Sequence, residues 1–349
     1  MVLMCHSVFV TETSSKFWVE FLKVAAITRS GLDLFFVLSG FLIGGILLDA
    51  RSSPNYFKTF YIRRAYRILP LYGIITARFF VSRLHFAQSG PLLPLTIPWF
   101  AYVTLTQNLW IAWLGSWGPA AMTVTWSLAV EEQFYLTAPV LIRKLKERTL
   151  VVALITVILV APLLRVLLND YVAHGGFSCY FLTPCRADTL CMGVLAAYAV
   201  RSARFRKLLY SRKRWLYSAT SFLFLGVVYL ACKRYSPFES PMNTLGLSWL
   251  GLFYTGILLI ALLPGSGWAQ SLLSKRWLMF LGTIAYGSYL IHMPLIYGFR
   301  DILLFFKFSQ TVTSFAGGLL GVAATLVLAT ISWKFFEQPL LRRGRTYTY

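Results

Sequence analysis

The amino-acid sequence predicts an all-α integral membrane protein, a bundle of about ten transmembrane helices. Of its 349 residues, 58% are hydrophobic and only 13% are charged, whereas about a quarter of the residues in soluble domains are charged. Apolar runs of roughly 20 residues, enough to cross a bilayer as a helix, recur from end to end. Tryptophan and tyrosine flank many of these runs, as interfacial anchors do.

The positive charge is distributed as in a membrane protein rather than a nucleic-acid-binding one. The formal net charge is +21, but most Lys and Arg residues cluster between the apolar runs, where they mark the cytoplasmic side. Both chain ends are therefore predicted to be cytoplasmic, in a multi-pass plasma (inner) membrane protein without a nucleic-acid partner. Anionic lipid headgroups are an expected partner of the largest cluster. The clusters are 51–67, 143–148, 201–214, 275–276 and 342–345.

The spans follow from the apolar runs and from the need to keep every basic cluster on one side. Three apolar stretches separate 51–67 from 143–148, but an even number of spans is required there. The middle stretch, 92–113, is rich in proline, which interrupts helices. It is predicted to be an external interfacial or re-entrant segment whose backbone must be shielded by protein. The predicted spans are 1–10, 31–49, 66–84, 123–142, 149–168, 186–200, 215–231, 245–263, 278–299 and 312–335.

A single polytopic domain is expected over 1–340, followed by a short basic cytoplasmic tail, 341–349. The first span is short, because ten helical residues cover only about 15 Å, half of the hydrocarbon core. The chain is therefore expected to lack part of this span, which an upstream extension of roughly ten to twenty residues would complete.

The five cysteines show no metal-ligand spacing, and no metal site is predicted. Cys179 and Cys185 are expected in one external loop, either as a disulfide or as free thiols.

Titratable groups inside apolar spans are costly and are functional candidates by default. His6 and His292 both lie in predicted spans, and an imidazole suits proton transfer at neutral pH. Asp33 lies near the start of GLDLFFVLSGFLI (31–43), where a helix N-terminus would also favour a carboxylate. Ser39 and Gly40 can equally form a small-residue packing notch. The structural and the functional interpretation remain open for these residues.

Two further motifs carry charge into the spans. YIRRAYRILPLY (61–72) places Arg63, Arg64 and Arg67 on neighbouring helix faces, where they can grip phosphate through bidentate donors or simply set the topology. TWSLAVEEQFYLTAP (125–139) places Glu131 and Glu132 deep in an apolar span, which favours a function over a structural role.

Helical spacing brings Trp126 onto the face of Val130, and Glu131 onto the face of Tyr135. Arg186 opens a later span in RADTLCMG (186–193), and Glu337 in FFEQPL (335–340) fits a local role at a helix end.

These motifs, together with SYLIHMPL (288–295), occur in the order found in the acyltransferase three family of integral membrane O-acyltransferases, which the chain resembles over nearly its whole length. The resemblance implies a ten-helix bundle that takes an acyl group, often acetyl, from cytoplasmic acyl-CoA. The group passes to a hydroxyl of an exported or cell-envelope glycan, with no permanently bound cofactor. The family usually carries an arginine about eleven residues before the catalytic histidine, a position that precedes the first residue here, so either the start is misassigned or this copy is impaired. The family often fuses a soluble hydrolase-like domain after the bundle. This chain ends nine residues past Leu340, so a stand-alone form is expected.

By motif position, His6 resembles the family's catalytic histidine, and Arg64 and Arg67 resemble its donor-linked arginine pair. As a hypothesis, His6 is the general base and Glu131 its orienting or proton-relaying partner. Further candidates occupy other positions of the motifs. Catalytic candidates are thus His6, Glu131, Asp33 and Ser39, and substrate-binding candidates are Arg63, Arg64, Arg67, Trp126, Glu132, Arg186 and His292.

The competing interpretation is a non-enzymatic transporter or flippase of a glycan or lipid-linked intermediate. Such a protein would also bury charges, but it predicts paired broken helices in two matching halves. The sequence shows no such repeat.

Overall fold

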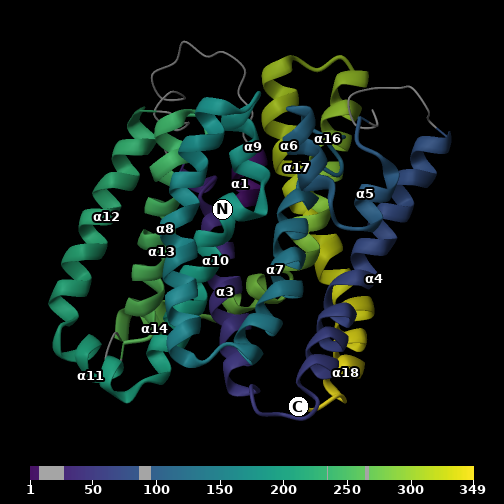
Figure 1. Ribbon diagram of the computed structural model, residues 1–349. Coiled ribbons are helices and arrows are strands. Elements are labelled where there is room, and N and C mark those ends of the chain that lie inside the picture. The colour runs from purple at the N-terminus through teal and green to yellow at the C-terminus, as the bar shows by residue number, and fades with distance from the viewer. Residues whose placement is uncertain (8–26, 86–95, 234, 264–266) are drawn as a thin grey trace.

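The computed structural model describes residues 1–7, 27–85, 96–233, 235–263 and 267–349, and it contains no strand in these ranges. Long helices run roughly side by side between two ends of the molecule (Figure 1). The helices of the first half are α1 (Val2–Ser7), α3 (Gly31–Asp49), α4 (Tyr56–His85), α5 (Trp99–Val103), α6 (Gln107–Leu114), α7 (Thr125–Lys144) and α8 (Glu147–Tyr171). Those of the second half are α9 (Gly175–Phe181), α10 (Thr183–Arg201), α11 (Ala203–Ser211), α12 (Lys213–Lys233), the π-helical turn η1 (Met242–Gly246), α13 (Leu247–Ala261), α14 (Gly267–Leu273), α15 (Arg276–Thr283), α16 (Ala285–Phe305), α17 (Gln310–Ser332), the π-helical turn η2 (Trp333–Glu337) and α18 (Gln338–Arg345).

The structure confirms an all-α, multi-pass membrane protein. Within the described ranges, five helical segments are long and apolar enough to cross a membrane, and α15 with α16, bent by 68°, makes a sixth. Three more helices, α4, α7 and α10, have 30, 20 and 19 residues, and they carry most of the predicted site residues. The number of ten spans and their orientation remain predictions, and residues 8–10 of the first predicted span lie outside the described residues.

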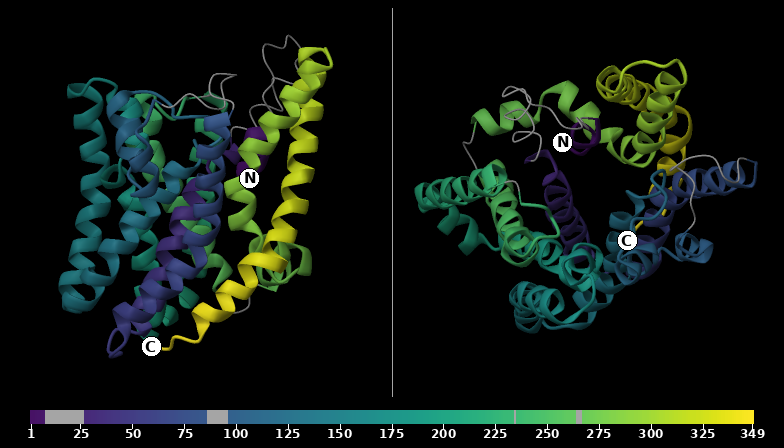
Figure 2. Two further views of the ribbon diagram at one scale, coloured as in Figure 1. Left: turned by 90° about the vertical axis from the view of Figure 1, so that its right-hand side faces the viewer. Right: turned by 90° about the horizontal axis from the view of Figure 1, so that it is seen from above.

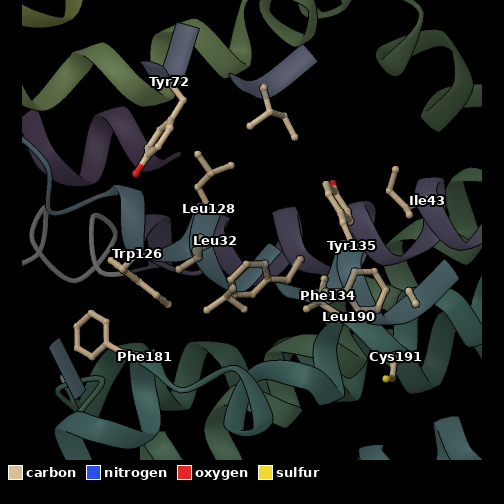
Figure 3. Close-up of a cluster of buried hydrophobic side chains, with 14 of the residues drawn as sticks. Leu32, Ile43, Tyr72, Trp126, Leu128, Phe134, Tyr135, Phe181, Leu190 and Cys191 are labelled. Carbon is tan, nitrogen blue, oxygen red and sulfur yellow. The ribbon is translucent and has the colours of Figure 1, made fainter. Parts of the chain in front are cut away.

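Helices α3 and α10 pack closely, because glycines let the two backbones approach each other. A Cβ atom added to Gly40 would collide with the carbonyl oxygen of Leu190, and one on Gly193 would collide with the carbonyl oxygen of Val37. The predicted small-residue notch at Gly40 is thus present in the structure. Large apolar side chains from α3, α7, α9 and α10 fill the space around this contact (Figure 3), and α3 lies on the inner side of the ring of helices seen from above (Figure 2).

Of the segment predicted to be interfacial or re-entrant, residues 92–95 lie outside the described residues, and the described part forms α5 and α6, which are too short to span a bilayer. Several of its polar groups are bonded by protein: Gln107 donates to the Thr125 carbonyl at 2.8 Å, and Gln133 of α7 donates to Leu105 O at 3.1 Å and to Asn108 Oδ1 at 2.9 Å. This is the shielding that non-helical backbone at membrane depth requires. That the segment lies outside the cell remains a prediction.

The structure differs from the sequence predictions in three places. The external loop predicted around Cys179 and Cys185 is wrong, because the two residues lie in α9 and α10, where both are buried free thiols. Helix α4 begins at Tyr56, ten residues before the predicted span. The span predicted from 278 is divided, since α15 is an exposed amphipathic helix set at an angle to α16, as an interfacial helix would be.

The C-terminal residues pack on α4 at the end of the molecule where the basic clusters lie, which is called the basic end below. Helix α18 leaves the line of α17 and packs on α4 (Figure 2). Thr59 donates a hydrogen bond to the Thr348 carbonyl and Arg63 Nε donates one to the Tyr347 carbonyl, both at 2.8 Å. The predicted tail, 341–349, is therefore helical up to Arg345 and docked on α4 beyond it. Helix α11, α14 and the C-terminus all lie at this end (Figure 1).

Candidate active site

The Glu131 carboxylate of α7 is held by two hydroxyl groups. Ser39 of α3 donates to Glu131 Oε1 at 2.5 Å, and the Tyr135 hydroxyl, one turn along α7, donates to the same oxygen. The Ser39 and Tyr135 hydroxyls are themselves 2.8 Å apart. Glu131 is only 6% exposed, so the helical spacing that predicted the pairing of Glu131 with Tyr135 produces a buried and ordered carboxylate.

The arginine motif of α4 divides into two groups. Arg64 lies over the Tyr135 ring at 5.6 Å, and both Arg64 and Arg67 lie within electrostatic range of Glu131. Arg63 is directed to the C-terminal residues instead, because its Nε bonds the Tyr347 carbonyl and its guanidinium lies 5.2 Å from the Tyr349 ring. Only Arg64 and Arg67 therefore adjoin the buried carboxylate.

Two further carboxylates lie near these arginines. Glu132 faces the charges of Glu131 and Arg64, and its Oε1 atom has no hydrogen-bond partner among the described residues. Glu337 in η2 is buried, accepts a hydrogen bond from Ser332 at 2.9 Å and lies within range of Arg67. The sequence favoured a local helix-end role for Glu337, and its nearness to Arg67 could not be found from sequence, since the two residues come from opposite ends of the chain.

Asp33 and Arg186 form a buried ion pair between α3 and α10. Arg186 Nη2 donates to Asp33 Oδ1 at 2.5 Å, so the carboxylate in the first turn of α3 does more than complement the helix N-terminus. The guanidinium lies between the rings of Phe36 and Tyr180, at 5.3 and 5.4 Å from their centres. Its Nε and Nη1 atoms have no partner among the described residues. Buried donors without acceptors are costly, which marks this guanidinium as a place for a ligand oxygen.

A second buried arginine shows the opposite pattern. Arg165 of α8 donates from Nη1 and Nη2 to Asp188 at 3.0 Å and from Nε to the Thr244 carbonyl at 3.0 Å, and Ser248 also donates to Asp188, at 2.5 Å. All of its donors are used, so it ties α8, α10 and α13 together. Arg165 was not among the predicted site residues, although an arginine within an apolar run is a signal visible in the sequence.

The two histidines lie side by side. The rings of His6 and His292 are 5.2 Å apart, centre to centre. The backbone of α1 is held to α16 by Arg300, which donates to the Ser7 carbonyl at 3.0 Å. Glu131 bonds Ser39 and Tyr135 rather than His6, so the expected contact between Glu131 and His6 is not made. The imidazole next to His6 is that of His292.

Trp126 joins the aromatic wall around Arg186. Its ring lies 5.0 Å from Tyr180 and 6.4 Å from Phe36. Phe181, at 4.8 Å, is shown near Trp126 in Figure 3. Tyr180 also lies within electrostatic range of both Arg186 and Cys5, the neighbour of His6. Aromatic residues therefore connect the Asp33–Arg186 pair with α1.

The polar groups form a series along the bundle. Arg64 and Arg67 lie nearest the basic end, followed by Glu131 with Ser39. Asp33 lies six residues from Ser39 on α3, or about 9 Å along the helix axis. Most of the predicted site residues are thus buried between the helices, whereas Arg67 is exposed and Arg63 is directed to the C-terminal residues.

The family model of the acyltransferase domain matches residues 1–334 of the chain. The chain belongs to this acyltransferase family. It is 29% identical to YrhL of Bacillus subtilis (strain 168) over 334 residues, which cover 90% of this chain and 50% of that protein.

Two further relatives carry names that state an activity. The peptidoglycan O-acetyltransferase OatA of Listeria monocytogenes is 27% identical to this acyltransferase-family chain over 333 residues, or 90% of the chain and 51% of OatA. The O-acetyltransferase OatA of Staphylococcus aureus (strain NCTC 8325 / PS 47) is 24% identical over 330 residues, or 90% and 53%. The chain spans about half the length of these curated relatives. No solved structure matches it.

Proposed function

We propose that the chain is a membrane O-acyltransferase that moves an acyl group, acetyl in the simplest case, from cytoplasmic acyl-CoA to a hydroxyl of a cell-envelope glycan. The observation that carries this proposal is the interior series of polar groups, with cations at one end and imidazoles further in. Membership of the acyltransferase family supports the reaction class. The name of the Listeria relative makes peptidoglycan the first acceptor to test.

Arg64 and Arg67 are the proposed anchors for the phosphates of acyl-CoA. Planar guanidinium groups bind phosphate through paired N–H donors, and these two adjoin Glu131 at the basic end of the bundle. An acyl group carried by a donor held there would enter the interior series of polar groups. Trp126 and the neighbouring aromatic rings would pack against the acyl chain or the acceptor.

The proposed chemistry needs a base and a donor for the negative charge that develops on the carbonyl oxygen. His6 removes the proton of the acceptor hydroxyl, whose oxygen then bonds to the carbonyl carbon of the thioester. The unpaired Nε and Nη1 donors of Arg186 stabilise the oxyanion, and Asp33 holds the guanidinium in place. The carbon–sulfur bond breaks, and the thiolate of coenzyme A takes up the proton.

Mass spectrometry of envelope glycans, with and without the gene, tests the function. We expect the loss of one ester from the glycan while the amount of glycan is unchanged. A transporter or flippase would instead change the amount of exported glycan and leave its remaining esters as they were.

Donor binding can be tested with a matched set of arginine variants. Arg64→Ala should weaken coenzyme A binding strongly, and Arg67→Lys should weaken it although the charge is kept, because lysine lacks the paired donors. Arg63→Ala is the control, since Arg63 is bound to the C-terminal residues. Equal donor affinity in all three folded variants would leave these residues with a role in topology alone.

A further inference from the structure

The tautomer of His292 is fixed by its backbone contact. His292 Nδ1 lies 2.7 Å from the carbonyl oxygen of Tyr289, and a carbonyl oxygen can only accept a hydrogen bond, so Nδ1 carries the hydrogen. In the neutral ring, Nε2 therefore presents a lone pair. His292 is fully buried, and Nε2 has no hydrogen-bond partner among the described residues. A buried acceptor without a donor is costly, and it calls for an explanation in function.

The distance to His6 suits the passage of a proton. Two imidazoles joined by an N–H···N bond of about 2.9 Å have ring centres roughly 5 Å apart. The observed separation is 5.2 Å with the ring planes inclined by 48°. The distance between the two ring centres is therefore that expected of imidazoles within reach of an N–H···N bond.

His292 can carry a positive charge without losing its backbone contact. In the protonated ring both nitrogen atoms carry a hydrogen, so Nδ1 still donates to the Tyr289 carbonyl and the hydrogen gained lies at Nε2.

We propose that His292 is the proton-relay partner of His6, the position that the sequence suggested for Glu131. His6 takes the proton of the acceptor hydroxyl at one ring nitrogen while its other nitrogen passes a proton to Nε2 of His292. His6 stays neutral, and His292 holds the charge with Nδ1–H on the Tyr289 carbonyl. When the carbon–sulfur bond breaks, the proton returns through His6 to the thiolate. The inference rests on the proposed acyl transfer.

The variant His292→Asn separates the relay from the anchoring contact. The asparagine amide can still donate to the Tyr289 carbonyl but has no atom in place of Nε2. We expect kcat for transfer from acetyl-CoA to fall by about 10²–10⁴-fold, as for loss of a general base, with KM for acetyl-CoA unchanged. Free imidazole added to the assay should restore part of the activity of His292→Asn. A double variant with His6→Ala should be no slower than His6→Ala alone, since residues of one proton path are not additive.

Thr325→Val is the matched control, because Thr325 is fully buried on α17 and only donates to the Gly321 carbonyl. It should leave kcat near that of the parent. The relay is refuted if His292→Asn transfers acetyl at the parent rate. It is also refuted if added imidazole restores no part of the kcat that His292→Asn has lost. A parent protein that transfers no acetyl group from acetyl-CoA would instead refute the proposed function.

Discussion

Two arginines in this bundle are equally buried, yet they have different surroundings. Arg165 donates to Asp188, to the Ser248 hydroxyl and to backbone carbonyls, whereas two nitrogen atoms of Arg186 have no partner within the part of the chain that the structure describes. Because an unused buried donor costs free energy, the first arrangement indicates stability and the second indicates a ligand. The residue type alone does not distinguish them.

Substitutions at the two positions should therefore separate stability from activity. Arg165→Leu leaves the Asp188 carboxylate buried without its cation, which typically costs about 3–5 kcal/mol, so we expect a large drop in thermal stability in detergent. Arg186→Lys keeps the ion pair to Asp33 but lacks donors in place of the Nε and Nη1 atoms of Arg186, so the protein should fold while kcat falls. A stable Arg165→Leu protein, or a fully active Arg186→Lys protein, would contradict this division.

Ser39 offers a second test at the scale of one residue. Ser39→Ala removes a donor to Glu131 and a contact of Tyr135, and we expect acyl transfer to be about 10- to 150-fold slower, because loss of one hydrogen bond to a charged group costs about 1.5–3 kcal/mol. Ser178→Ala is the control, since Ser178 is buried but donates to the Ala112 carbonyl. Equal kcat values for the two variants would remove Ser39 from the mechanism.

At the scale of elements, the contact of α3 with α10 positions the site. It carries Asp33 and Ser39 on one helix and Arg186 on the other, and the two backbones meet at Gly40 and Gly193. The distance between α3 and α10 therefore determines whether the Arg186 guanidinium can contact the Asp33 carboxylate.

Alanine substitutions should show this dependence. Gly40→Ala forces the helices apart, since its Cβ would overlap the Leu190 backbone, and we expect lower thermal stability together with lower activity. Gly73→Ala on α4 meets nothing within 4 Å, so it should stabilise the protein by about 0.5–1 kcal/mol, the usual helical preference for alanine over glycine. Thermal unfolding in detergent measures both, and a stable Gly40→Ala protein would argue against close packing here.

At the scale of the whole molecule, the basic clusters gather at one end, where α11 and the docked C-terminal residues lie (Figure 1). This is the arrangement that the positive-inside rule requires if that end is cytoplasmic. It would place the proposed donor site at Arg64 and Arg67 on the side where acyl-CoA is available.

Cysteine labelling from outside the cell tests this orientation. In a Cys232→Ser background, which removes an exposed native thiol, Trp117→Cys should react with an impermeant reagent and Leu208→Cys should not. Both positions are exposed in the structure. Labelling at 208 but not at 117 would show that the topology is the reverse of the predicted one. Arg64 and Arg67 would then lie on the side opposite to cytoplasmic acyl-CoA.

The helical membrane fold could be predicted, and residues for the candidate site could be proposed, because both depend on local sequence. Length and apolarity of a run decide whether it suits a membrane, and a charge such as Glu131 inside such a run is visible without any structure. The division of α15 from α16 and the helices around Cys179 were missed, because bends and short helices depend on packing with distant segments.

The sequence by itself determined that this is a helical membrane protein and several of the polar side chains that it buries, such as Asp33, Glu131 and Arg186, since apolar length and the cost of a buried charge are properties of each segment. Only the tertiary structure decided the partners. Ser39 meets Glu131 from 92 positions away and Asp33 meets Arg186 from 153, and His6 meets His292 rather than Glu131. These pairings depend on the rotation of each helix about its axis and on the glycine contacts that set helix spacing, which no single segment encodes.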